Sequence, residues 1–260
     1  MSLLTTLRRD PKRELWFVWY STVAFYSLYT VVFFILTRTQ PPSQPWLSPD
    51  QTIDWFAGRG QLMVFGFALI FVLGGFSATS IALITYSIRR MSVSRAYAHS
   101  YLLLYAVAAI PGFLFICIAM TAGVLRPERD PALQQWLYDF GFLSFSGTRG
   151  VFLVGSLIWM AAILLDENGV FPKWFGYLNL CNALTEVVIA PSWIFQRGVL
   201  AWNGVIAWWI DVVVFGLYTG VFIYLLRDLI QRDDLGDGPV PSLAPDAPRR
   251  THPLAKVVTS

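Results

Sequence analysis

Charge is scarce in this chain: Asp, Glu, Lys and Arg make up 13% of 260 residues, while hydrophobic residues make up 56%. A soluble domain needs about a quarter of its residues charged to cover its surface. Since the chain has half that share and a mean hydropathy of +0.56, most of its surface must face lipid. The composition excludes an ordinary soluble domain and predicts a membrane protein whose main partner is the lipid bilayer.

Cysteine and histidine are nearly absent, which excludes several kinds of site. Cys117 and Cys181 fall within apolar runs and form no CxxC pair, so a structural disulfide is not expected. His99 and His252 lie outside the apolar runs. A haem held by two histidines, or a zinc or copper cluster, would therefore have no ligands within the membrane. We expect neither a metal nor another cofactor.

Six long apolar runs can be placed along the chain. A helix that crosses a bilayer needs roughly 20 consecutive apolar residues, and runs this long without period-2 alternation are helices. We therefore predict an all-α membrane protein, a bundle of six transmembrane helices. The predicted spans are 15–37, 61–86, 101–125, 140–165, 173–195 and 202–226.

The six runs divide the chain into three regions. Residues 1–14 form a basic N-terminus and residues 15–232 form the transmembrane domain. Residues 233–260 are rich in Pro, Asp and Gly and poor in apolar side chains, so we predict a disordered tail.

The basic residues predict an orientation. With the N-terminus in the cytoplasm, thirteen Lys and Arg side chains fall in inner segments and five in outer loops, leaving Arg149 inside a span. This bias follows the positive-inside rule, so we expect a bacterial inner (plasma) membrane protein with both termini in the cytoplasm. The net charge of +3 reflects the same bias, and it implies no nucleic-acid partner.

A short helix is predicted in the first outer loop. Ser48 is a suitable cap residue, Pro49 stands at the first helical position and Gln51 at the third. The helix should carry Trp55, end before Gly58 and lie along the outer interface. It either anchors the chain at the interface or covers a cavity.

Glycine and proline predict breaks within the spans. The fourth span follows a helix start at Asp130-Pro131 and is too long for one straight helix, so we expect a break at Gly141 or at Ser146-Gly147. Pro111-Gly112 should interrupt the third span. Pro191 should kink the fifth, because proline removes a backbone hydrogen bond.

Small residues recur at intervals of four in two spans. Gly74, Ala78 and Ala82 follow this spacing in the second span, and Gly216 and Gly220 in the sixth. Such spacing is typical of close helix contacts in membranes. It is compatible with a compact bundle or with a homo-oligomer.

Three predicted spans each carry one charged residue at a similar depth: Arg149, Glu186 and Asp211. Each lies nine residues from the outer end of its span, which is roughly 13–14 Å below the surface. An isolated charge there costs about 2.5–3.5 kcal/mol, so we expect the guanidinium to pair with both carboxylates inside the bundle. Because two acids oppose one base, we expect Glu186 to hold a proton near neutral pH. Ser146 and Ser156 are predicted to share the helix face of Arg149.

The surroundings of these charges predict a polar site. Asn179, Asn182 and Glu186 lie at positions i, i+3 and i+7, on one face of the fifth span, and Tyr218 shares the face of Asp211. We assign Glu186 and Asp211 as candidate acid and base. The candidate substrate-binding residues are Arg149, Asn179, Asn182 and Tyr218.

Three functions fit this pattern. In the first, the protein binds or converts a small lipophilic molecule, with Glu186 exchanging a proton and Arg149 holding an anionic group. In the second, it is a proton-coupled carrier of a small solute. In the third, it is an accessory or assembly subunit whose charges only specify helix packing. The sequence leaves all three open.

Residues 171–180 read FPKWFGYLNL and residues 201–204 read AWNG. They resemble a pattern, FPxWxGYLNL followed by AWNG, of uncharacterised bacterial integral membrane proteins. The resemblance covers mainly the fifth and sixth spans. It implies a six-helix inner-membrane protein and brings no assigned activity.

Overall fold

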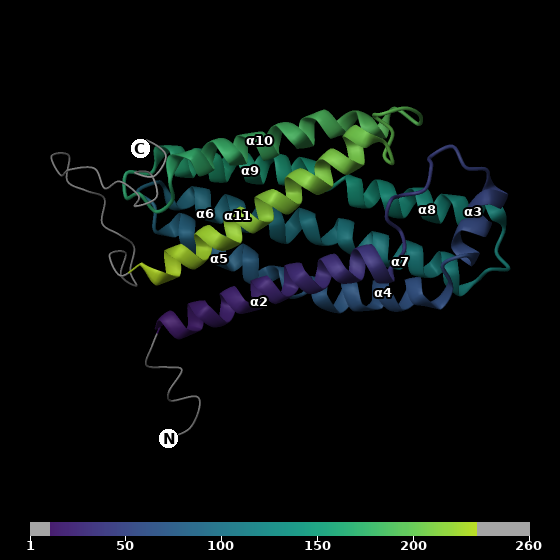
Figure 1. Cartoon of the computed structure of the whole chain (residues 1–260), viewed down its shortest axis with the longest axis horizontal. Helices are drawn as coiled ribbons and strands as arrows, with labels where there is room; N and C mark the ends of the chain where they lie inside the picture. The colour runs from purple at the N-terminus through teal and green to yellow at the C-terminus, as the bar shows by residue number, and fades with distance from the viewer. Residues whose placement is uncertain (1–10, 233–260) are drawn as a thin grey trace, which may run out of the picture.

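The computed structural model describes residues 11–232, without the side chains of residues 11 and 108–111. Within this range the chain is helical with no strand, and it forms an elongated bundle (Figure 1). The first described helix begins and the last one ends at the same end of the bundle, on the left in Figure 1. We call this the terminal end and the opposite one the distal end. The predicted disordered tail and residues 1–10 lie outside the described residues.

Six helical stretches make up the bundle, and each combines an α-helix with another helical segment. In chain order they are α2 (Pro11–Val31) with the π-helix η1 (Val32–Leu36); α4 (Gly60–Gly74) with α5 (Ser77–Arg89); α6 (Arg95–Leu104), the π-helix η2 (Tyr105–Ala109) and α7 (Ile110–Leu125); α8 (Pro131–Ser146) with α9 (Arg149–Leu165); α10 (Lys173–Ile189) with the 3₁₀ turn η3 (Ala190–Trp193); and the π-helix η4 (Val205–Ile210) with α11 (Asp211–Gln231).

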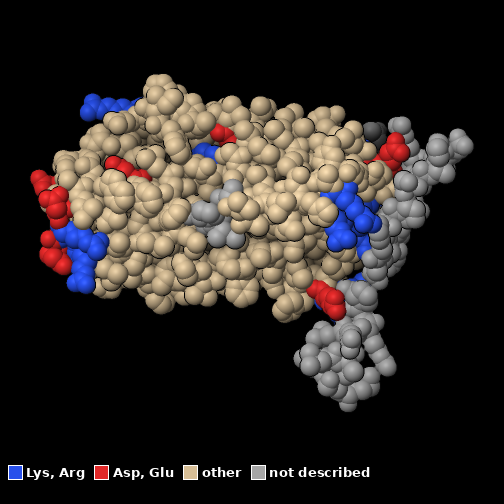
Figure 2. Space-filling view, turned by 180° about the vertical axis from the view of Figure 1, so that it is seen from behind, with Lys and Arg blue, Asp and Glu red and all other residues tan. Residues whose placement is uncertain are grey.

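Five of the stretches are long and apolar enough to cross a membrane. They are Lys12–Leu36, Gly60–Arg89, Arg95–Leu125, Pro131–Leu165 and Val205–Gln231. Charged side chains gather at the two ends of the molecule, and the face between them carries few (Figure 2). A protein with such a surface is embedded in a membrane.

The predicted fifth span differs from the other five. Its helix α10 has 17 residues, which is shorter than those five stretches, and ends at Ile189 instead of continuing to residue 195. Pro191 explains this end, because it has no N–H to bond the carbonyl of Val187 and the chain tightens into the turn η3.

The short helix predicted in the first loop is confirmed as α3 (Pro49–Ala57). The side chain of Ser48 accepts a hydrogen bond from the N–H of Gln51, and the side chain of Gln51 accepts one from the N–H of Ser48. This reciprocal pair is a capping box. α3 lies at the distal end (Figure 1) and packs against α8 and α7. Its buried Phe56 lies over Gly123, where a Cβ atom would come within 2.5 Å of the ring.

The fourth stretch breaks where one of the two predictions placed it. α8 ends at Ser146 and α9 begins at Arg149, while Gly141 lies inside α8. α7 passes close to this break, since a Cβ atom on Gly112 would meet the side chain of Thr148 at 2.1 Å. A helix break that is packed this closely is a built feature of the bundle.

The other interruptions were predicted less well. The third stretch continues past Pro111 without a gap, and its irregular segment η2 comes just before that proline. The second stretch breaks after Gly74, which was predicted as a helix contact. Cβ atoms built on Gly74, Gly216 or Gly220 would meet nothing within 4 Å. The homo-oligomer therefore stays a prediction.

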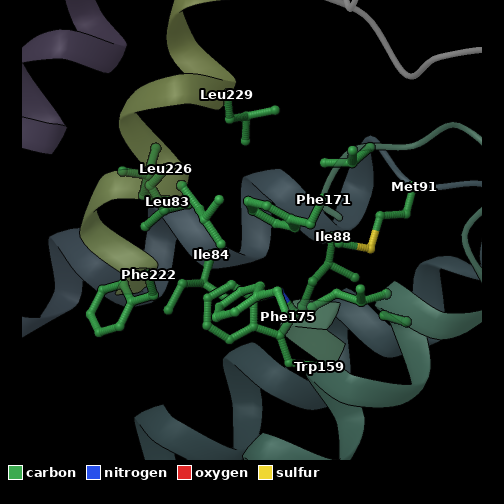
Figure 3. Packing of buried hydrophobic residues seen from close by; sticks show 14 of the residues in the cluster. Leu83, Ile84, Ile88, Met91, Trp159, Phe171, Phe175, Phe222, Leu226 and Leu229 are labelled. Atoms are coloured by element: carbon green, nitrogen blue, oxygen red, sulfur yellow. The ribbon is translucent and has the colours of Figure 1, made fainter. Parts of the chain in front are cut away.

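Buried apolar side chains form two separate clusters. The terminal core is contributed mainly by α5, α6, α9, α10 and α11 and includes Trp159, Phe175 and Phe222 (Figure 3). The distal core is contributed mainly by α2, η1, α3, α4, α7 and α8 and includes Phe67 and Phe142. The second, third and fourth stretches pass from one core to the other at their irregular segment or break, and the sixth does so where η4 meets α11.

Hydrogen bonds close the terminal end. Asp166, buried in the α9–α10 loop, accepts from the backbone N–H groups of Ser92, Asn168 and Val170. Lys173 donates to the carbonyls of Ile163 and Leu164 and to that of Asp166. A cation on the last carbonyls of α9 is the favoured partner for that helix end.

Candidate functional site

The three charged residues predicted to meet do so. Nη1 of Arg149 donates to Oδ2 of Asp211 at 3.0 Å and to Oε2 of Glu186 at 3.3 Å. The side chains of Arg149 and Glu186 are 14% and 8% exposed, and that of Asp211 is 22% exposed. We call these three residues the charged cluster. Asp211 is its most accessible member.

The charged cluster lies at the border between the two cores. Arg149 is the first residue of α9, directly after the break, and Asp211 is the first residue of α11, directly after η4. Glu186 lies in the last turn of α10, and its carbonyl accepts from the N–H of Ala190. Every helix that supplies a charge is therefore irregular next to it.

The start of α9 favours negative charge nearby. The cap residue of this helix, Thr148, makes no side-chain hydrogen bond to the first turn. The positive end of the helix dipole and the guanidinium of Arg149 consequently coincide, which is unfavourable unless negative charge lies nearby. Glu186 and Asp211 supply that charge from two other helices.

A ladder of polar pairs continues from the charged cluster toward the terminal end. Asn182 Nδ2 donates to Ser156 Oγ at 2.9 Å, and the hydroxyl of Tyr218 donates to Asn179 Oδ1 at 2.7 Å. Asn179 Nδ2 in turn donates to the carbonyl of Phe175. We call Ser156, Asn179, Asn182 and Tyr218 the polar ladder.

Similar spacing on three helices places the polar ladder beside the charged cluster. Ser156 comes seven residues after Arg149, Tyr218 seven after Asp211, and Asn179 seven before Glu186. Seven residues are two helical turns, about 10 Å along the axis. Because α10 runs antiparallel to α11, Tyr218 meets Asn179, which is equally far from the charged cluster. Ser156 instead meets Asn182, which is four residues from Glu186.

The polar ladder ends against aromatic rings of the terminal core. Phe175 stacks on Tyr218 with ring centroids 6.1 Å apart, and Trp159 meets Tyr218 edge-on at 6.4 Å. Trp159 and Phe175 also lie edge to face with each other (Figure 3). Polar groups of this site therefore stop at a tightly packed apolar layer.

The sequence prediction brought together the right residues, but two of them satisfy each other. Asn179 and Tyr218 are buried and use their polar atoms within the polar ladder. They fix how α10 and α11 align and leave the charged cluster as the reactive part. Ser146, predicted to share the face of Arg149, belongs to α8 on the other side of the break.

One hydrogen-bond donor of the charged cluster is unused. Nε of Arg149 is buried and has no hydrogen-bond partner among the described residues. Leaving such a donor unsatisfied costs about 1–3 kcal/mol. A ligand oxygen or a water molecule that reaches this nitrogen would remove that cost.

Sequence reasoning missed Tyr105 of η2. Its ring lies against Gly155, where a Cβ atom would come within 2.5 Å. No local pattern in the third span points to Tyr105, because its position depends on how that span packs against α9. The signal in the sequence was Gly155, next to Ser156, because a glycine at that position leaves room for a side chain from another helix.

Comparison with protein-family models, with curated proteins and with solved structures gives no match to this chain. The resemblance to uncharacterised bacterial membrane proteins stays a prediction.

Proposed function

We propose that this protein binds a small lipophilic molecule at the charged cluster and exchanges a proton with it. In this proposal it is a six-span protein of a bacterial inner membrane, with α10 as the fifth span and both termini in the cytoplasm. The position of α10 alongside α9 supports counting α10 as a span, which brings the number of spans to six (Figure 1). So does the return of the chain to the terminal end.

The observation that carries the proposal is the charged cluster itself: three ionisable groups from three helices, 3.0 and 3.3 Å apart, between two apolar cores. Ionisable groups within the membrane are expensive and are generally functional. A molecule that reaches the partly exposed Asp211 from the bilayer must itself dissolve in lipid.

The chemistry follows from the charge balance of the charged cluster. With one base and two acids, it is neutral only when one carboxyl carries a proton, and an apolar environment favours neutrality. The bound proton can pass to a ligand from Glu186 or Asp211. The free Nε–H of Arg149 can donate to an oxygen of the same ligand.

Molecules that copurify with the protein test the proposal. The protein is purified in a mild detergent, and its bound molecules are extracted and compared with the bulk membrane lipids by mass spectrometry. We expect one lipophilic compound to be enriched with the wild type and to fall about tenfold with Glu186→Gln and Asp211→Asn, since each removes a charge-assisted contact. Any conversion of that compound by the purified protein should be lost in Glu186→Gln.

Two exposed residues supply matched controls. Glu128→Gln and Asp50→Asn make the same chemical changes outside the charged cluster and should keep the compound. Extracts from the wild type with the composition of the bulk lipids would contradict the proposal. So would a compound retained in full by the Glu186→Gln protein.

The helix breaks favour a second candidate, a proton-coupled carrier. Discontinuous helices around intramembrane charges are typical of carriers, in which one part of the bundle moves against the other. Here the second and fourth stretches are broken and the third and sixth contain π-helices. Proteoliposomes with an internal pH-sensitive dye should then acidify when solute enters down an imposed pH gradient. Uptake that ignores the gradient would count against this candidate.

A further inference from the structure

A second candidate site lies at the distal end, and none of the three residues of the charged cluster lines it. It is an open pocket of about 640 Å³ between the segment that follows η1, the helix α3 and the segment around η4. Its lining includes four side-chain amides, two indoles and one carboxylate. The residues that matter to the argument are Gln40, Asp54, Trp55, Arg59, Asn203 and Trp209.

The walls of this pocket are held in place by hydrogen bonds between distant parts of the chain. Trp202 Nε1 donates to the carbonyl of Ser43 at 2.7 Å, and the N–H of Ser43 donates to the hydroxyl of Tyr138 at 2.9 Å. Gln135 Nε2 donates to the carbonyl of Leu47 at 2.9 Å. The pocket is thus a built feature rather than a loose loop.

Two buried polar atoms of the lining residues have no partner among the described residues. They are the indole nitrogen Nε1 of Trp55 and the amide oxygen Oε1 of Gln40. One is a donor and the other an acceptor. A donor to the amide oxygen and an acceptor from the indole N–H would satisfy these atoms, and hydroxyls can serve as either.

The charges of the pocket point to a neutral ligand. The guanidinium of Arg59 is already used: it lies 3.8 Å over the ring of Trp55 and donates to the carbonyls of Arg38 and Trp55. Among the lining residues there is one other charged side chain, the exposed carboxylate of Asp54. The lining residues therefore carry one charge of each sign and offer no excess of either to an ion.

We propose that the distal pocket binds a neutral polyhydroxylated group, a sugar ring. The hydroxyls of such a ring bond the side chains of Gln40, Asp54, Trp55 and Asn203. The ring of Trp209, 48% exposed, supplies a flat apolar surface for the C–H face of the sugar. The sugar can belong to a free glycoside or to the head group of a glycolipid.

Binding of a labelled sugar tests this site. The full chain is placed in phosphatidylcholine nanodiscs and titrated with radiolabelled methyl β-glucoside. Unlabelled glucosyl diacylglycerol in the same nanodiscs serves as the competitor. We expect saturable binding that weakens about tenfold in Trp209→Ala and in Gln40→Leu, because stacking or an acceptor is lost. Trp136→Ala, which removes an exposed indole from α8 outside the pocket, should bind as the wild type does.

The titration with and without the competitor distinguishes a free glycoside from a glycolipid head group, and its outcomes can contradict the proposal. Saturable binding of the glucoside without competition assigns a soluble ligand, whereas competition by the glycolipid assigns a lipid head group. Absence of saturable binding of the labelled glucoside by the wild type overturns the proposal. Equal binding by Trp209→Ala also overturns it, because the sugar would then lie elsewhere.

A measurement on the wild type alone tests the proposal even if the variants do not fold. N-bromosuccinimide oxidises exposed tryptophans, and mass spectrometry maps the oxidised residues. A bound probe should protect Trp209 at least about tenfold more than Trp136, since Trp209 lines the pocket and Trp136 does not. Equal oxidation of Trp209 with and without either probe would exclude the sugar from this pocket.

Discussion

The terminal core and the distal core differ in how they end. Beyond the terminal core, hydrogen bonds to Asp166 and from Lys173 close the bundle. Beyond the distal core lies an open pocket, with unsatisfied polar atoms on Gln40 and Trp55. Lipid is as apolar as either core, so dispersion and hydrogen bonding hold these helices together. The closed end is therefore suited to stability, and the open end and the border between the cores to binding.

Removal of Trp159 from the terminal core should cause the largest loss of stability. It is 1% exposed and touches Phe171, Phe175, Tyr218 and Phe222. We expect Trp159→Ala to lower the free energy of unfolding by about 3–5 kcal/mol, because the surrounding rings cannot fill the cavity. Reversible unfolding in mixed micelles measures this loss.

An exposed tryptophan gives the matched control for that measurement. Trp136 on α8 is 56% exposed, so Trp136→Ala should change the free energy of unfolding by about 0.5 kcal/mol or less. Similar losses in the two variants would mean that the terminal core contributes no special stability.

Arg149→Met should have the next largest effect. It leaves two carboxylates facing each other without a cation, which should cost about 3 kcal/mol of unfolding free energy. Adding Glu186→Gln and Asp211→Asn should recover more than half of that loss, because no charge then remains to be paired. The same unfolding measurement follows the single and the triple variant.

The triple variant also separates binding from packing. If it folds but loses the copurifying compound, the charges serve binding. A triple variant that keeps the compound, or single variants that lose only stability, would instead favour the accessory-subunit function, in which the charges specify helix packing.

Tyr218→Phe should have the smallest effect of the three. It removes the donor to Asn179 Oδ1 and leaves that buried oxygen without this bond. The expected loss is about 1–2 kcal/mol of unfolding free energy. Tyr177→Phe on α10, where the side chain is 61% exposed, should cost nothing measurable. A full-size loss in Tyr177→Phe would show that hydroxyls facing lipid matter as much as the polar ladder does.

Much of the site could be predicted because local rules set its parts. Helix rise places Arg149, Glu186 and Asp211 at one depth, and the cost of a lone charge in lipid forces them together. The capping box of Ser48 sets the start of α3, and Gly147 follows the end of α8. Both helix ends depend on residues only a few positions away, so they could be predicted. The position of Tyr105 follows no such rule, since it depends on contact with a distant helix.

The sequence by itself determined that the chain is a bundle of apolar helices with a few charges that must find one another, because burial cost and helix geometry are local properties. Only the tertiary structure decided that there are two cores, that several helices are broken or irregular at their border and that an open pocket forms at the distal end. These features depend on which side chains from distant segments fill the same space, and that outcome is set by packing over the whole bundle.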